Sequence, residues 1–193
     1  MEIRHWIKIC EGNIVRDGEI IASQGDTAPE NFYRQLQCSY PKFFKMDVLC
    51  KWAWLGAEAL LYEDSSFVYE GMDKNKVAVV MATAHGCLEI DKKYQQSLRT
   101  IPSPALFVYT LSNIMLGEIC IRHGFKGEQA CFINDAFDSS WLQFYVADLL
   151  ENRGMEACIC GWADAVEDQY EVRMFWVVKD GKGLPFSAAA MEV

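Results

Sequence analysis

The sequence predicts an α/β fold with a mainly parallel five-stranded sheet in the order β-α-β-α-β-α-β-β. Short β-branched segments alternate with segments in which apolar residues recur every three or four positions. Lys76–Thr83 is apolar almost throughout, which is typical of a parallel strand covered on both faces. The last two strand-like segments are separated only by a short acidic turn, which indicates an antiparallel edge.

The first half of the chain is expected to contain a hairpin, a helix and the buried strand. Trp6–Val15 has the composition of a strand entering a hairpin, whereas Ile20–Gln37 is predicted to be irregular. Apolar residues at helical spacing predict a helix over about Lys45–Leu61. These residues are Met46, Leu49, Cys50, Trp54 and Leu55.

The second half is expected to contain two long helices and three strands. A helix is predicted from Pro104 to Ile121, since proline suits the first turn of a helix. Gln129–Asn134 is predicted as a short strand, and Asp138 as the N-cap of a helix over Ser139–Asn152. The two closing strands are Met155–Ala163 and Tyr170–Val178.

Composition limits the class of protein. A chain of 193 residues with 51% hydrophobic side chains predicts one domain over residues 1–193. The net charge of −9 argues against nucleic-acid and anionic-membrane partners. There is no apolar run of membrane-spanning length and no signal-peptide pattern, so we expect a cytoplasmic protein. The eight cysteines lie among apolar neighbours, which predicts reduced core thiols, no metal site and no cofactor.

Several short motifs occur in a characteristic order between about Tyr40 and Ala165. Ser103-Pro104-Ala105-Leu106-Phe107, followed by Ser112–Glu118, resembles the proline-initiated helix of β-ketoacyl synthases. Gly124–Gly127 resembles their turn before the strand that leads to the nucleophile, and Gly154 with Cys160-Gly161-Trp162 resembles the segment after the nucleophile helix. The chain is therefore similar to the N-terminal half of this acyltransferase family (3-oxoacyl-ACP synthases, thiolase-like superfamily).

The resemblance implies a reactive cysteine at the N-terminus of the helix that begins near Ser139, where the helix dipole favours a thiolate. Counting from the flanking glycines places this position at Ala136 or Phe137, and neither is a cysteine. Cys131 is expected to lie inside the preceding strand, unactivated. The two family histidines belong to a C-terminal half that this N-terminal-half-only member is expected to lack. No catalytic residue is carried over, and we expect the chain to be inactive alone.

The resemblance also predicts partners. We expect a non-catalytic or partner-dependent component of fatty-acid or polyketide-type (aryl polyene-like) acyl chain biosynthesis. It would form a homo-dimer, or a hetero-oligomer with a catalytic ketosynthase, and would contact an acyl carrier protein. The predicted interface is an edge strand made of Gln129, Ala130, Cys131, Phe132 and Ile133. Replacing Phe132 with lysine is expected to yield a monomer.

Two alternatives remain open at this stage. His85 and Cys87 follow the buried strand, where open α/β sheets bind ligands, so the pair could process a thioester. The chain could instead be a purely oligomeric scaffold. Asp164, Glu167 and Asp168 are interpreted as turn residues, and Asp135 and Asp138 as caps. The helix Ser139–Asn152 is apolar on most sides, which predicts an apolar surface patch on it or on the Pro104–Ile121 segment.

Overall fold

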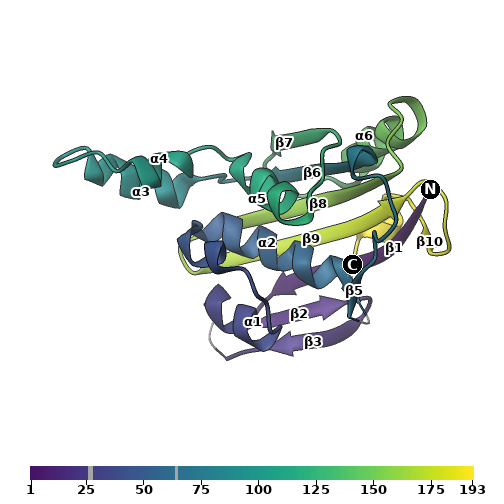
Figure 1. Cartoon of the computed structure of the whole chain (residues 1–193), viewed down its shortest axis with the longest axis horizontal. Coiled ribbons are helices and arrows are strands. Elements are labelled where there is room, and N and C mark those ends of the chain that lie inside the picture. The colour runs from purple at the N-terminus through teal and green to yellow at the C-terminus, as the bar shows by residue number, and fades with distance from the viewer. Residues whose placement is uncertain (26–27, 64) are drawn as a thin grey trace.

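The computed structural model describes residues 1–25, 28–63 and 65–193. Its main feature is one mixed sheet in the order β3-β2-β1-β9-β8-β6-β7, with β10 paired to β1 (Figure 1). The strands of this sheet are β1 (Glu2–Cys10), β2 (Asn13–Arg16), β3 (Glu19–Ser23), β6 (Val77–Thr83), β7 (Gln129–Ile133), β8 (Ala157–Val166), β9 (Gln169–Val178) and β10 (Leu184–Pro185). A separate small ribbon pairs β4 (Tyr62–Glu63) with β5 (Ser66–Phe67).

The helices connect these strands and pack on both faces of the sheet. They are α1 (Pro29–Gln35), α2 (Val48–Leu61), α3 (Leu88–Ser97), α4 (Pro104–Val108), α5 (Ile114–His123) and α6 (Ser139–Asn152). Short 3-10 turns occur at Pro41–Lys45, Lys74–Lys76 and Ala189–Met191. None of the helices in the described ranges is long and apolar enough to cross a membrane.

The prediction of a mainly parallel five-stranded sheet is wrong. Only β6 pairs in parallel, with β7 on one side and β8 on the other. The pairs β8–β9, β9–β1, β1–β2 and β2–β3 are all antiparallel. The N-terminal hairpin is part of the same sheet, because β1 pairs with β9 on the side away from β8.

Two apolar layers cover the two faces of the sheet. Side chains alternate between the faces of a strand, and in β6 Val79 belongs to the layer under α2 and α5 while Val80 belongs to the layer under α6. All seven residues of β6 are buried, as the continuous apolar run predicted. The C-terminal segment also packs in the α6 layer, through Phe186 and Met191.

Three predicted segments differ in the structure. Ile20–Gln37 is not irregular, because it contains most of β3 and all of α1 on either side of residues 26–27, which lie outside the described ranges. The Pro104–Ile121 helix is divided into α4 and α5. The hydroxyl of Thr110 donates to the carbonyl of Phe107 at 2.8 Å, a local bond that accompanies the end of α4. Helix α3 was not predicted.

Helix α6 has the predicted bounds. The Asp138 carboxylate accepts a hydrogen bond from the Trp141 amide at 2.9 Å, which confirms the predicted cap. The buried face of the helix consists of Leu142, Val146, Leu149 and Leu150 together with Ser139. Phe144 lies on the outer face with 74% of its surface exposed, so the helix is covered on one side only.

Helices α3 and α4 form an arm that extends away from the sheet (Figure 1). We use "the arm" for residues 88–111. Several large apolar side chains of the arm are exposed. They are Leu88, Leu98, Ile101, Phe107, Val108 and Leu111. Exposed apolar side chains therefore lie on both segments for which a surface patch was predicted.

Candidate functional site

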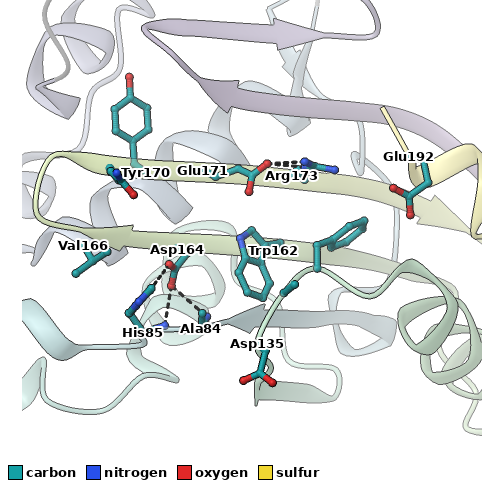
Figure 2. A pocket seen from close by; sticks show the side chains of 13 residues that line it. Ala84, His85, Asp135, Trp162, Asp164, Val166, Tyr170, Glu171, Arg173 and Glu192 are labelled. Atoms are coloured by element: carbon teal, nitrogen blue, oxygen red, sulfur yellow. Dashed lines mark hydrogen bonds and ion pairs between the residues drawn. The ribbon is translucent and has the colours of Figure 1, made fainter.

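A cleft of about 480 Å³ opens where the carboxyl ends of β6, β7 and β8 meet, beside the first residues of β9 (Figure 2). Open α/β sheets bind ligands at this end of their parallel strands. His85 and Asp164 line one side of the cleft, and Phe137 and Trp162 provide aromatic surface. The sheet order brings together residues that are far apart in the sequence.

Asp164 on β8 is the most extensively hydrogen-bonded side chain of the cleft. One carboxylate oxygen accepts from the Thr83 hydroxyl at 2.7 Å, the Ala84 amide at 3.1 Å and the His85 amide at 2.9 Å. The other oxygen is 2.6 Å from Nδ1 of His85. Burial alone would raise the pKa of Asp164, but the hydrogen bonds from His85 and Thr83 hold it below its ordinary value. Asp164 is therefore an ionised acceptor.

This pairing defines the state of the His85 ring. An ionised carboxylate only accepts hydrogen bonds, so Nδ1 of His85 carries the proton. In the neutral ring Nε2 then has a free lone pair, and no partner of Nε2 is found within the described part of the chain. The His85 side chain is 46% exposed and borders the cleft. A dyad of this form can orient a base without occupying its reactive nitrogen.

Cys87 has different neighbours from His85. Its thiol donates to Asp91 at 3.3 Å and accepts from the Ser112 hydroxyl at 3.7 Å. Burial raises the pKa of Cys87 above its ordinary value, which disfavours the thiolate. Among the described contacts none joins the His85 side chain to the Cys87 side chain.

The position expected for the family nucleophile lies in the same cleft. Ala136 and Phe137, in the loop between β7 and α6, both line it. The Phe137 ring lies 5.5 Å from the Arg173 guanidinium. Cys131 lies inside β7, as expected from the sequence, where burial raises its pKa to about 11. The lining residues of the cleft include no cysteine.

The charges around the cleft are mainly negative. Asp135, Glu171 and Glu192 line it in addition to Asp164, and Arg173 is its one guanidinium. Arg173 donates to Glu171 at 2.7 Å, so much of its charge is compensated (Figure 2). Across the described residues, no group of three or more His, Cys, Asp or Glu side chains is arranged to hold a metal ion.

The predicted interface strand, β7, is the last strand of the sheet order, so the edge position is confirmed. Gln129 and Ile133 are exposed, and Ala130, Cys131 and Phe132 are half-buried. The Phe132 ring lies 4.3 Å from that of Trp141 and 5.1 Å from that of Tyr145. Phe132 therefore packs against α6, and replacing it with lysine would disturb this layer as well as the edge.

Sequence reasoning singled out His85 but interpreted Asp164 as a turn residue. The two are 79 residues apart, and only the parallel pairing of β6 with β8 makes them neighbours. Trp162 was noted only as part of a motif, and Arg173 was not considered. The sequence did contain a carboxylate on one strand and a histidine in the loop after another strand. These could be recognised as a pair only once the order of the strands in the sheet was known.

The mixed sheet, the edge strand β7 and the loop before α6 are arranged as in the thiolase-like fold of ketosynthases. The similarity covers most of the chain, although no protein-family model and no curated protein sequence matches it. At the sequence identities below, the comparisons show the fold alone.

Three solved structures carry this assignment. The ishigamide ketosynthase/chain length factor matches with a TM-score of 0.68 at 15% identity, over 92% of this chain and 62% of that chain. A ketosynthase (ApeO) in complex with its chain length factor (ApeC) from Xenorhabdus doucetiae matches with a TM-score of 0.58 at 12% identity, over 94% of this chain and 80% of that chain. A type II polyketide synthase acyl-carrier protein in complex with its hexaketide-bound ketosynthase (AntDE:AntF) matches with a TM-score of 0.62 at 13% identity, over 92% of this chain and 62% of that chain. The chain thus spans less than two thirds of two of these relatives.

Proposed function

We propose that this chain is a ketosynthase-like subunit that does not itself condense acyl units and that works beside a catalytic ketosynthase in fatty-acid or polyketide-type (aryl polyene-like) acyl chain biosynthesis. The observation that carries the proposal is the combination of a ketosynthase-like fold with a cleft that has no thiol at Ala136 or Phe137. The three similar structures are ketosynthase assemblies by their own descriptions, which supports a paired arrangement.

Condensation in such a fold requires a nucleophile that carries the acyl group. Cys131 does not supply one, because burial keeps its thiol protonated and it lies within β7, outside the cleft lining. Cys87 is likewise protonated and hydrogen-bonded to Asp91. A catalytic partner must therefore supply the acyl-carrying thiol.

The edge of β7 supports the pairing step of the proposal. Asn134 donates its amide to Thr83 of β6 at 3.1 Å, and amides alternate in direction along a strand. The amides of Gln129, Cys131 and Ile133 therefore point away from β6. Together with the exposed Ile133 side chain, they offer a second chain a strand edge to pair with.

The first test is a condensation assay with acyl and malonyl carrier thioesters. We expect no product from the purified chain alone, and product when a ketosynthase encoded beside it is co-purified and added. Labelled acyl transfer to Cys131 in the chain alone would overturn the proposal. Failure to form any complex with the neighbouring ketosynthase would also count against it.

The second test concerns the edge itself. Ile133→Pro removes the outward amide and the exposed side chain while leaving the amides that face β6 in place. We expect it to abolish complex formation in light scattering, whereas Ile133→Ala, which keeps the amide, should retain most of it. Equal association of both variants would show that β7 is not the interface.

A further inference from the structure

The His85–Asp164 dyad has the geometry of an oriented base facing an open cleft. The 2.6 Å contact fixes the proton on Nδ1, and three further hydrogen bonds hold the Asp164 carboxylate in place. In the neutral ring the Nε2 lone pair has no partner in the described part of the chain, and His85 lines the cleft.

The other two histidines are arranged differently. His5 also pairs with an aspartate, Asp17, at 2.8 Å, but its Nε2 lies 3.6 Å from Glu63 and it does not line the cleft. His123 is fully enclosed in the core. Only His85 combines a carboxylate-oriented ring with a free nitrogen and access to a cavity.

We propose that His85, positioned by Asp164, is a general base that activates a water molecule in this cleft for the hydrolysis of a neutral acyl thioester. The substrate class rests on the proposed function, because in the ketosynthase-like arrangement the acyl carbonyl reacts at the position occupied here by Ala136 and Phe137. These two residues line the same cleft as His85. Since neither is a nucleophile, water takes the role that a cysteine would have.

The reaction is balanced without any further reagent. His85 Nε2 accepts a proton from water as the water oxygen bonds to the thioester carbonyl carbon. The carbon–sulfur bond then breaks, and the imidazolium returns the proton to the departing thiolate. The products are a carboxylic acid and a thiol, and the Asp164 carboxylate stabilises the transient imidazolium.

The charges of the cleft select among acyl groups. Asp135, Glu171 and Glu192 line the same cleft as the dyad, and Arg173 is engaged by Glu171. A malonyl group would bring a further carboxylate into this surplus of negative charge. A neutral alkanoyl group is not repelled and can contact Phe137 and Trp162. The site therefore favours neutral acyl over malonyl thioesters.

The test uses octanoyl and malonyl N-acetylcysteamine thioesters with the full chain, following loss of thioester absorbance. We expect hydrolysis of the octanoyl probe above the buffer rate and little hydrolysis of the malonyl probe. His85→Ala should lower kcat by about 100-fold or more. His5→Ala is the matched control, since it removes an aspartate-paired histidine elsewhere, and it should retain full activity.

The variant Cys87→Ala tests whether hydrolysis depends on His85 as a base or on the Cys87 thiol as a nucleophile. Full activity in this variant, with loss in His85→Ala, supports water as the nucleophile. Loss in Cys87→Ala, or no hydrolysis of either probe by the native chain, would overturn the proposal.

Asp164 is a positioning residue, and its test needs a readout beyond activity. Asp164→Asn removes the charge that stabilises the imidazolium, so the rate should reach its plateau at lower pH while its maximum falls. A purely structural role would lower the rate equally at all pH values, and that outcome would refute positioning through charge. Thermal unfolding of the variant checks that the loop after β6 remains folded.

The two proposals fail independently. His85→Ala should bind the neighbouring ketosynthase as the native chain does, because His85 is not part of β7. Retained complex formation without hydrolysis would leave the proposed function intact and remove only the hydrolytic inference.

Discussion

His123 is a buried, uncharged imidazole in the layer between α5 and the sheet. Its Nδ1 lies 3.0 Å from the Tyr69 hydroxyl, and the ring packs against Phe125. Burial lowers the pKa of His123 to about 3, and the nearby charges of Arg122 and Lys74 act in the same direction. The Glu58 carboxylate is 3.5 Å from Nε2 and would favour protonation, but two hydrogen bonds from Arg122 engage it, and burial dominates.

This residue predicts a loss of stability in mild acid. The unfolded chain protonates His123 near pH 6.5, whereas the folded chain stays neutral until about pH 3. The free energy of unfolding should therefore fall as the pH drops through this window, by on the order of 2–3 kcal/mol between pH 6.5 and 4.5 from this group. His123→Phe should show a smaller fall in urea denaturation than the native chain over the same pH window. Parallel curves for His123→Phe and the native chain would refute the assignment.

Two neighbouring residues of β7, Phe132 and Ile133, are expected to contribute differently to the free energy of unfolding. Phe132 contacts Trp141 and Tyr145 of α6, whereas Ile133 is 62% exposed. We expect Phe132→Ala to lower the free energy of unfolding by roughly 2–4 kcal/mol and Ile133→Ala by less than about 0.5 kcal/mol. Urea denaturation of the two variants checks this. A cost for Ile133→Ala as large as that for Phe132→Ala would contradict the described packing.

The antiparallel pair β8–β9 depends on a close approach at Gly161. A Cβ atom at this position would lie 2.0 Å from the carbonyl oxygen of Arg173. Gly161→Ala should therefore cost about 1–3 kcal/mol or more, because backbone must move. The control is Gly117→Ala in α5, where a Cβ meets nothing within 4 Å and alanine should stabilise the helix by roughly 0.5–1 kcal/mol. Thermal unfolding distinguishes the two, and equal effects would refute the steric argument.

Elements with a strong local pattern could be predicted from the sequence. α6 and β6 were identified because one has apolar residues at helical spacing behind an aspartate cap and the other is apolar throughout. α3 was missed because its sequence, LEIDKKYQQS, is mostly polar and buries only Ile90. Residues 104–123 form two helices, α4 and α5. The Thr110 hydroxyl bond that accompanies the end of α4 cannot be read from the spacing of apolar residues.

At the scale of the whole molecule, the strand order could not be predicted locally. The alternation of strands and helices correctly indicated parallel pairing of β6, β7 and β8, but it contains no information on where the N-terminal hairpin joins. The candidate site could not be predicted in full from local sequence for the same reason. His85 was recognised from its position after β6, whereas its partner Asp164 became visible only once β8 was placed beside β6.

The exposed apolar side chains of the arm predict self-association of the isolated chain. Ile101, between α3 and α4, is 83% exposed, and Phe107 on α4 is 57% exposed, in the arm that extends away from the sheet. The double variant Ile101→Lys, Phe107→Lys should lower the concentration-dependent mass in light scattering while changing the melting temperature little. Lys45→Ala with Lys92→Ala is a surface control. A mass that does not depend on concentration in the native chain would refute the prediction.

The pairing of β1 with β9 also constrains how the chain is made. Ile7 lies opposite Met174, so β1 is synthesised well before the strand β9 that pairs with its other side. Until then the hairpin has one open side and the layer beneath α2 is incomplete. Such long-range closure slows folding and prolongs exposure of apolar strands. The nascent chain should therefore acquire its native sheet only after β9 has been synthesised, and a chaperone bound to the β1–β2 hairpin until then would shield its open side.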